Sequence, residues 1–434
     1  MREGSAVDTA ITSSEPREIT DTHRRGSDTR PGLAIVSNCI TPYRIHLHRL
    51  IAAGIPELRL HTLATHGVGE FDWQVNLPPE IHAANVSDPG DRPTDKPFRR
   101  PWGEIQKASR LERYFEENNV RVAVFNGYNY TSYLKLMNYC YRQQIPFFLR
   151  SDSNIRSENR LSRVSRICKR IVYRWWMKRA AGIFSMGRLG DQFFLKYGAD
   201  PKKLYRVPYW PDFDSFARVD SWELERFQRK FGLDGRRSYL VFSGRLARVK
   251  RVDLLIDAFA AIAESRPNWD LVIVGDGALK EKLRQQVPEA LQSRVVWTGF
   301  VEGADSVSSY HAADVLVLPS DFEPWALVVQ EAMAAGLTVV ASDIVGAAYE
   351  LVTDKVSGRI FTAGDRDLLR EALEDVTHPE RTEEYKRQST VALKQYLSNV
   401  DPVAEIRRAL TDAGILGRSV PPNLKSDIQP SHGQ

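Results

Sequence analysis

The chain has 434 residues, of which 42% are hydrophobic and 26% charged, and its formal net charge at pH 7 is +5. This composition is typical of a globular protein of two or three domains. It excludes a membrane-spanning protein, because no stretch approaches the roughly 20 consecutive apolar residues that a transmembrane helix needs. The net charge is too small to indicate nucleic-acid binding by itself, and no nucleic-acid partner is expected.

The first 30 residues are polar and rich in Ser, Thr, Arg and Asp, without the apolar core of a signal peptide. We predict that this segment is disordered. The chain has three widely spaced cysteines, which are Cys39, Cys140 and Cys168. Their number and spacing predict neither a disulfide framework nor a metal knuckle, and they favour a reducing compartment. We therefore expect a cytoplasmic protein.

Apolar runs that end in polar loop residues alternate with helical patterns in the first half of the chain. The runs predict strands at 32–38, 120–127, 145–152 and 180–187, and helices at 41–54 and 130–144. Because parallel strands need a crossover connection that is usually a helix, this alternation predicts a doubly wound α/β domain over residues 31–210.

A Pro- and aromatic-rich stretch at 207–216 interrupts the pattern and is predicted to connect two domains. The alternation then resumes and predicts a second doubly wound domain over residues 211–395. Its predicted strands are 238–245, 269–277, 294–300, 313–320 and 337–343, and its helices include 252–264, 278–287 and 326–335. Two further helical patterns follow at 383–399 and 402–414. With the second domain ending at 395, the C-terminal helix is predicted over 396–416, and a disordered tail is expected over 417–434.

The ends of the predicted strands in the second domain carry the residues of chemical interest. In open α/β sheets ligands bind at the carboxyl ends of the strands, so these loops should share one rim. The rim would hold glycines that permit close backbone approach, two cations, a carboxylate and a flat aromatic side chain. These residues are Gly244, Arg245, Lys250, Gly275, Phe300 and Glu323.

The segment "FEPWALVVQEAMAAG" (322–336) adds a second carboxylate, Glu331, in a helix that is otherwise nearly apolar. A charged group there costs several kcal/mol unless it is paired, and no basic residue lies within one helical turn. The start of the helix also offers unpaired amides to an anion. Cations and amides suit a diphosphate, and carboxylates accept hydrogen bonds from sugar hydroxyls. The rim therefore predicts a nucleotide diphosphate linked to a group that is rich in hydroxyls, with Glu331 accepting from the ribose.

Three segments, "GRLARVKRVDLLIDAFA", "LVIVGDGALKEKL" and "PSDFEPWALVVQEAMAAGLTVVASDIVGAAYELV", resemble glycosyltransferase family 4 (group 1), the retaining nucleotide-sugar enzymes of the GT-B fold. The resemblance implies two Rossmann-like domains facing a central cleft. It implies that Arg245 and Lys250 hold the donor diphosphate, and that Glu331 holds the ribose. The remaining donor contacts implied by the resemblance are backbone near Phe300 and Val301 for the base, and Glu323 with amides around Ala326 and Leu327 for the transferred sugar.

Two features depart from the family pattern. Ala326 stands where the family usually has glycine, which affects how closely the backbone can approach a phosphate. The loop "IVGAAYE" at 344–350 is one residue longer than its commonest form.

Polar residues also follow the predicted strands of the first domain, where they would face the rim across the cleft. The candidates to meet the acceptor or the donor sugar are Asn38, Tyr43, Arg44, Arg150 and Asp152. The alternative is that these side chains only cap helices and line loops.

The basic segment 156–179 has two main interpretations, and a nucleic-acid-binding patch stays open as a third. Val164, Ile167, Ile171 and Trp175 form an approximate apolar stripe opposite the basic residues. The stripe could pack on the sheet of the first domain. The other interpretation is an interfacial helix that meets anionic lipid, with Trp175 or Trp176 at the headgroups, which would make the protein peripheral on the inner face of the membrane.

The predicted activity is retaining transfer of a hexosyl or related sugar residue to an acceptor hydroxyl, and the expected acceptor is a glycan or lipid-linked glycan in cell-surface polysaccharide assembly. No cofactor and no metal are expected, because Arg245, Lys250 and a helix N-terminus meet the diphosphate charge. Asp212 and Asp214 have the spacing of a metal-binding pair, but they lie in the domain connection and are interpreted as turn formers. Two rivals stay open: a GT-B-fold epimerase or phosphorylase, and a sugar-nucleotide-binding protein without turnover.

Overall fold

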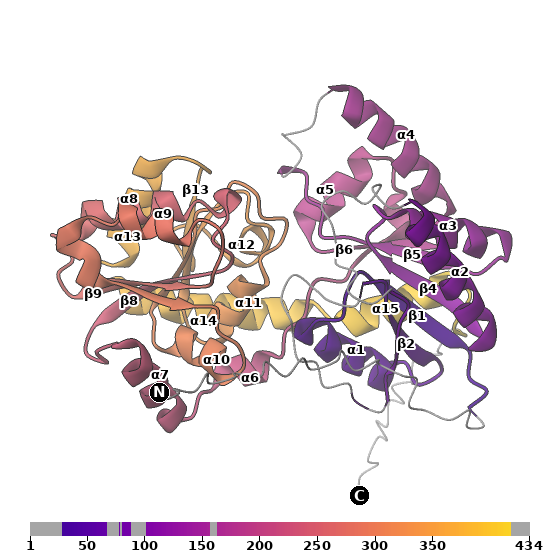
Figure 1. Ribbon diagram of the computed structural model, residues 1–434, viewed down its shortest axis with the longest axis horizontal. Helices are drawn as coiled ribbons and strands as arrows, with labels where there is room; N and C mark the ends of the chain where they lie inside the picture. Colours follow the sequence, from indigo (N-terminus) through magenta and orange to yellow (C-terminus); the bar gives the residue numbers. More distant parts are fainter. Residues whose placement is uncertain (1–27, 67–77, 79, 88–100, 157–162, 418–434) are drawn as a thin grey trace, which may run out of the picture.

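The computed structural model describes residues 28–66, 78, 80–87, 101–156 and 163–417, with the side chains of 101 and 163–168 outside that description. Two sheets organise these residues, and every strand in both sheets is parallel to its neighbours (Figure 1). This confirms the predicted fold class of two doubly wound α/β domains. The predicted disordered ends are 1–30 and 417–434, of which 1–27 and 418–434 lie outside the described residues.

The N-terminal sheet has the strand order β3-β2-β1-β4-β5-β6-β7. Its strands are β1 (Gly32–Ser37), β2 (Arg59–Ala64), β3 (His82–Asn85), β4 (Val120–Asn126), β5 (Phe147–Arg150), β6 (Gly182–Ser185) and β7 (Leu204–Arg206). The helices that connect them are α1 (Pro42–Gly54), α2 (Pro101–Glu117), α3 (Thr131–Arg142), α4 (Arg163–Arg179) and α5 (Arg188–Lys196), with the short 3-10 helix η2 (Pro201–Lys203).

Both faces of this sheet are buried, which explains why its strands are continuous apolar runs. Successive side chains of a strand point to opposite faces. Ala34 and Val36 of β1 accordingly join the core under α2 and α3, whereas Leu33 and Ile35 join the core on the side of α1.

The C-terminal sheet has the order β10-β9-β8-β11-β12-β13. Its strands are β8 (Ser238–Ser243), β9 (Trp269–Val274), β10 (Val295–Gly299), β11 (Val315–Leu318), β12 (Thr338–Ser342) and β13 (Gly358–Phe361). The surrounding helices are α6 (Phe213–Ala217), α7 (Ser221–Phe231), η3 (Arg248–Lys250), α8 (Val252–Ile262), α9 (Lys280–Gln286), η4 (Glu289–Arg294), α10 (Ala304–His311), α11 (Leu327–Ala334), α12 (Gly346–Leu351) and α13 (Arg366–Val376).

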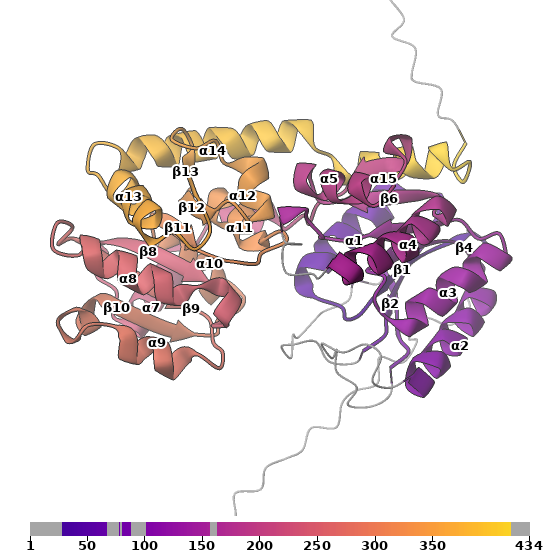
Figure 2. The same cartoon turned by 90° about the horizontal axis from the view of Figure 1, so that it is seen from above.

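The C-terminal end of the described chain returns to the first domain. Helix α14 (Thr382–Asn399) leaves the C-terminal domain, and α15 (Pro402–Asp412) lies against the N-terminal domain (Figures 1 and 2). Ile406, Ala409 and Leu410 of α15 join the buried core on the α1 side of the N-terminal sheet. The last helix is therefore part of the first domain's packing, which its position in the sequence did not predict.

In each sheet the strand order reverses once beside the first strand. The chain runs outward from β1 to β3 and then returns to β4, and it runs outward from β8 to β10 and then returns to β11. Ligands of open α/β sheets bind in the crevice at such a switch point, outside the carboxyl ends of the strands. The loops after β1 and β4, and after β8 and β11, are thus the places to look for a site.

Candidate functional site

The loops after β8 and β11 bring the two predicted donor-site residues Lys250 and Glu323 together. Lys250 ends η3, just beyond β8, and its ammonium group forms an ion pair with the Glu323 carboxylate. The Ser320 hydroxyl is 3.5 Å from the same carboxylate oxygen. Glu323 is only 9% exposed, so this ion pair lies in a partly dehydrated environment, where it is stronger than on an open surface. Arg245, on the loop between β8 and η3, is exposed at the same rim.

Glu331 has a partner that its helix does not supply. The Tyr310 hydroxyl of α10 donates to a Glu331 carboxylate oxygen over 2.8 Å, and the same hydroxyl lies 3.3 Å from the Ser243 hydroxyl at the end of β8. Burial raises the pKa of Glu331 to about 7, while the hydrogen bond from Tyr310 acts in the opposite direction. Tyr310 belongs to the candidate site, and nothing in its sequence position marked it, because it approaches Glu331 from another helix.

Ala326, the residue before α11, has a left-handed backbone with φ of 75°. An L-residue with a Cβ is disfavoured in this region, and glycine is the residue that normally occupies it. The departure from the family pattern noted in the sequence is therefore a real conformational cost. Leu327 begins the helix, whose first amides are left without a side-chain cap.

Gly275 and Gly277 of the rim have a packing role that the sequence did not predict. A Cβ on Gly275 would lie 1.9 Å from the Gly244 carbonyl oxygen, and a Cβ on Gly277 would lie 2.6 Å from the Leu246 carbonyl oxygen. The space that these glycines leave is occupied by the neighbouring loop, whose Leu246 amide donates to the Asp276 carbonyl over 2.9 Å. Glycine is therefore needed at 275 and 277 for the packing of these two loops, and the predicted approach of a ligand to Gly275 stays a prediction.

The segment after β12 supports the loop between β11 and α11 that carries Glu323, here called the Glu323 loop. The Gly346 amide donates to the Glu323 carbonyl over 3.3 Å, and the Ala347 amide donates to the Trp325 carbonyl over 2.8 Å. A Cβ on Gly346 would lie 2.1 Å from the Pro324 carbonyl oxygen. The segment "IVGAAYE", of which 346–350 belong to α12, therefore fixes the backbone that carries Glu323, a role that the sequence did not reveal.

The N-terminal domain faces this rim across a cavity of about 610 Å³, here called the cleft cavity. Four of the five predicted acceptor-side residues line it, namely Asn38, Arg44, Arg150 and Asp152. The fifth, Tyr43, packs edge-on against the lining residue Tyr209 with ring centroids 5.3 Å apart. Phe322 and Pro324 of the C-terminal domain complete the wall, so the cavity lies between the domains. Asn126, Asn129, Tyr130 and Tyr209 also line it and were missed in the sequence.

Hydrogen bonds across the cleft hold the Glu323 loop to the N-terminal domain. The buried Asn154 side-chain amide donates to the Pro324 and Ile344 carbonyls, each over 3.1 Å. Arg156 donates to the Asp343 carbonyl over 2.7 Å and forms an ion pair with the Asp343 carboxylate. Arg156 therefore bridges the domains, and its inclusion in the basic segment did not indicate this role.

The predicted base-contacting residues lie after β10, where Phe300 is 42% exposed and Val301 is partly buried.

In the domain connection, Asp212 caps α6 by accepting from the Ser215 amide and hydroxyl over 3.3 and 2.7 Å. This contact agrees with a turn-forming role. Among the described residues, no group of three or more His, Cys, Asp or Glu side chains is arranged to hold a metal ion.

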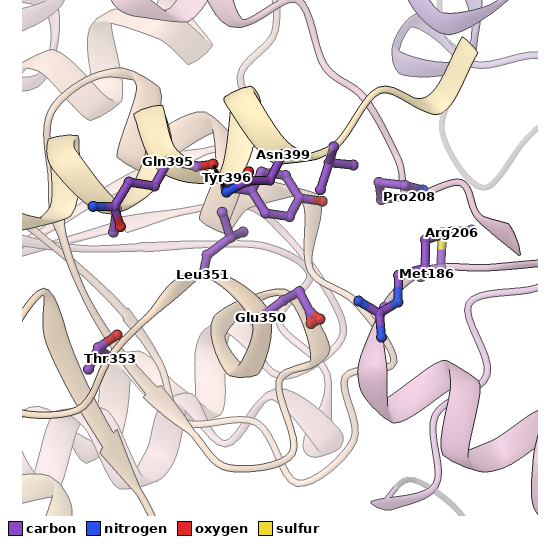
Figure 3. A pocket seen from close by; sticks show the side chains of 12 residues that line it. Met186, Arg206, Pro208, Glu350, Leu351, Thr353, Gln395, Tyr396 and Asn399 are labelled. Atoms are coloured by element: carbon purple, nitrogen blue, oxygen red, sulfur yellow. Dashed lines mark hydrogen bonds between the residues drawn. The ribbon is translucent and has the colours of Figure 1, made fainter. Parts of the chain in front are cut away.

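A second pocket of about 270 Å³ lies beside the domain connection and shares only Met186 with the cleft cavity. Figure 3 shows Arg206, Glu350 and Tyr396 among the side chains around it. None of the predicted site residues lines this pocket. Glu350 is engaged in an ion pair with Arg188 across the domain interface, so this region joins the two domains.

None of the described helices meets the length and hydropathy that a membrane crossing requires.

Comparison with known proteins agrees with this geometry. Residues 224–395 match the model of the family Glycosyl transferases group 1. Over 140 residues the chain is 39% identical to an uncharacterized glycosyltransferase of Methanocaldococcus jannaschii, and the match covers 32% of this chain and 35% of that protein. Over 153 residues it is 33% identical to the lipopolysaccharide core biosynthesis mannosyltransferase LpsB of Rhizobium meliloti, covering 33% and 43%.

The solved structure of Anabaena HepE in complex with UDP and glucose matches 89% of this chain and 100% of that one, with a TM-score of 0.65 and 16% sequence identity. The sequence alignments span 35% and 43% of the two curated relatives, whereas the structural likeness extends over both domains. Residues 224–395 of this chain are therefore similar to the group 1 glycosyl transferases. The two sheets of the chain, one in each domain, together form a GT-B fold.

Proposed function

We propose that this protein transfers a sugar residue from a nucleoside-diphosphate sugar to an acceptor hydroxyl with retention of anomeric configuration. The observation that carries the proposal is the contact between Lys250 and Glu323 at the switch point of the C-terminal sheet. The sequence neighbours of Glu323, Phe322 and Pro324, line the cavity between the two domains. A cation for the leaving phosphate and a carboxylate for the sugar hydroxyls thus lie side by side, which is the arrangement that the reaction needs.

In this proposal Arg245, Lys250 and the first amides of α11 bind the diphosphate and stabilise its negative charge as it departs. Glu331, oriented by Tyr310, accepts hydrogen bonds from the ribose hydroxyls. Backbone of the loop after β10 binds the base, and Glu323 accepts from hydroxyls of the transferred sugar.

The bond between the anomeric carbon and the phosphate oxygen breaks, and the bond to the acceptor oxygen forms on the same face of the sugar. The acceptor proton passes to the departing phosphate oxygen, so the simplest route needs no separate general base. The cations already present at the rim would make the reaction independent of a metal ion.

Three results separate this proposal from its rivals. A transferase releases nucleoside diphosphate only when acceptor is added. An epimerase changes the sugar nucleotide without acceptor, and a binding protein does neither. A thermal-shift screen over nucleotide sugars would first identify the donor, because a ligand that binds the folded state raises the unfolding midpoint. Nucleoside diphosphate release that is equally fast with and without acceptor would refute the transferase assignment.

We further propose a hexosyl or related donor sugar and an acceptor that is a glycan or a lipid-linked glycan, in agreement with the similarity to LpsB. We place the reaction on the cytoplasmic side of a membrane. The described part of α4 supports peripheral membrane contact, because Ile171 is 67%, Val172 47% and Trp175 42% exposed. The sequence-based alternative, in which the apolar stripe packs on the sheet, is wrong for Ile171 and Trp175. The side chains of Val164 and Ile167, which belong to the same stripe, lie outside the described residues. The buried face of the helix is formed by Trp176 and Met177 instead.

The exposed apolar residues of α4 alternate with the exposed basic residues Arg170, Arg174 and Lys178, a combination that suits the interface of an anionic bilayer. Flotation with vesicles of phosphatidylglycerol and phosphatidylcholine tests the contact. Trp175→Ser should reduce the bound fraction, whereas Trp222→Ser should not, because Trp222 is also exposed but lies on α7 of the other domain. Absence of wild-type flotation at low salt would end this part of the proposal.

A further inference from the structure

The cleft cavity contains two guanidinium groups whose charge is not balanced by adjacent carboxylates. Arg44 reaches it from α1 and Arg150 from the end of β5. Arg150 is only 4% exposed, and its hydrogen bonds go to the carbonyls of Val207 and Pro208 and to the Asn126 side chain. All of these acceptors are uncharged.

Arg44 is bonded in the same way. One of its terminal nitrogens donates to the Asn38 side-chain oxygen over 3.1 Å and to the Cys39 carbonyl over 2.5 Å. Its Nε is buried and has no hydrogen-bond partner. Within the described ranges of the chain, neither Arg44 nor Arg150 forms an ion pair with a carboxylate.

Aromatic rings hold both guanidinium groups in place. The Arg44 guanidinium lies 5.7 Å from the ring centroid of Tyr43, and that of Arg150 lies 5.2 Å from the ring centroid of Tyr209. The two rings pack against each other edge-on. Because this pairing fixes the cations without neutralising them, the arginines are preorganised for a ligand.

The surroundings make this end of the cavity electropositive. Asp152 is the single carboxylate among the described lining residues, against Arg44, Arg150 and Lys169. Burial raises the pKa of Asp152, which disfavours its charged form. The pKa of the buried His48 is lowered to about 3, first by burial and then by the charges of Arg150 and Arg44.

Neutral sugar hydroxyls would be served by the amides that line the cavity, which include Asn38, Asn126 and Asn129. The donor diphosphate has its own cations, Arg245 and Lys250, neither of which lines the cavity. The burial of Arg150 and the partial burial of Arg44 without a counter-charge are costly unless a ligand supplies one.

We propose that Arg44 and Arg150 form a subsite for an anionic group, a phosphate or a carboxylate, on the molecule that occupies the cleft cavity. The assignment rests on the proposed function, in which that molecule is either the acceptor or the transferred sugar. A guanidinium pair matches both oxyanions, because its planar fork donates two parallel hydrogen bonds.

The test measures binding without turnover, in a protein that carries Arg245→Ala and Lys250→Ala so that the donor-site cations do not contribute. Glucose 6-phosphate and glucuronate are titrated by calorimetry at constant ionic strength, with glucose as the neutral reference. The subsite predicts that both anions bind at least about tenfold more tightly than glucose.

Arg44→Gln, introduced into the protein that carries Arg245→Ala and Lys250→Ala, should remove the preference for the anions over glucose. Asp152→Asn should increase that preference, because the opposing carboxylate is lost. Arg49→Gln is the matched control, since Arg49 is exposed on the same helix. Equal binding of the anions and glucose, or equal effects of Arg44→Gln and Arg49→Gln, would overturn the subsite.

A second arm identifies which molecule carries the anion. The protein with intact Arg245 and Lys250 is titrated with two donors, a nucleoside-diphosphate glucuronate and the corresponding nucleoside-diphosphate glucose. Both donors carry the base that stabilises the protein in the thermal-shift screen. A preference for the glucuronate donor that Arg44→Gln abolishes assigns the anion to the transferred sugar, and no such preference assigns it to the acceptor. Failure of every nucleotide to stabilise the protein would instead refute the proposed function, while the glucose 6-phosphate titration would still decide the subsite.

Discussion

Removal of the Tyr310 hydroxyl should make nucleotide binding depend more steeply on pH. Tyr310→Phe deletes the donor that lies 2.8 Å from the Glu331 carboxylate, while the ring stays in its buried position against Phe216. A hydrogen bond to a charged group contributes about 1.5–3 kcal/mol, and 1.36 kcal/mol corresponds to one pKa unit. The pKa of Glu331, which is about 7 in the native protein, should therefore rise to about 8–9 in the variant.

The expected change in affinity follows from the ionised fraction of Glu331, because the carboxylate accepts more strongly from ribose hydroxyls than the neutral acid does. At pH 7 about half of the native protein is ionised, against a few per cent of the variant, so the variant should bind nucleoside diphosphate about tenfold more weakly. At pH 9.5 both proteins are ionised, and their affinities should agree within about threefold.

Calorimetric titration with nucleoside diphosphate from pH 6 to 9.5 gives the affinity of the wild type relative to that of Tyr310→Phe at each pH. The protonation of the ligand's own phosphates affects both proteins equally and cancels in this ratio. Tyr239→Phe is the control, because its buried hydroxyl bonds to the backbone of Asp234 at the other end of β8. A loss of affinity in Tyr310→Phe that is the same at every pH would show that Tyr310 acts through packing and not through the charge of Glu331.

The same pKa has a consequence for stability. Since burial raises the pKa of Glu331 from 4.5 to about 7, the native state holds this proton more tightly than the unfolded state. The free energy of unfolding should therefore fall as pH rises from about 4.5 to 7, and the loss is complete above the native pKa. Glu331→Gln should reduce that dependence without unfolding the protein.

Three further outcomes are expected. Ala326→Gly should raise the thermal midpoint in calorimetry, since it relieves a left-handed alanine that costs about 1 kcal/mol. Ala332→Gly in the interior of α11 should lower the midpoint, and a lower midpoint in both variants would contradict the strain at Ala326. Gly346→Ala should slow transfer at least about tenfold by displacing the Glu323 loop, unlike Gly103→Ala, whose Cβ meets open space. A chelator, or Asp212→Asn, should leave turnover within about twofold, and recovery of lost activity by manganese alone would refute metal independence.

The features that could be predicted from the sequence are those with a local signal. Buried parallel strands such as β8 and β9 are continuous apolar runs that end at glycines. Because such strands end at one edge of a sheet, the runs alone predict that Arg245, Lys250 and Glu323 share a rim. β3 and β13 are four-residue edge strands of mixed polarity, and they gave no such signal.

The features that could not be predicted depend on contacts between distant segments. Tyr310 and Glu331 lie on different helices, and Asn154 reaches the Pro324 carbonyl from the other domain. Gly346 is required because it packs on the backbone of a loop more than twenty residues earlier in the chain. α15 has an ordinary amphipathic pattern, which cannot tell which of the two domains its apolar face will cover.

The rate of sugar transfer by Lys250→Ala tests the central claim most directly. Transfer of labelled sugar from donor to acceptor is measured under single-turnover conditions for the wild type, for Lys250→Ala and for Lys282→Ala, an exposed lysine on α9. If Lys250 stabilises the departing diphosphate beside Glu323, its loss should slow transfer at least about a hundredfold, whereas Lys282→Ala should match the wild type. Transfer by Lys250→Ala at the wild-type rate would contradict the assignment of this rim as the catalytic site.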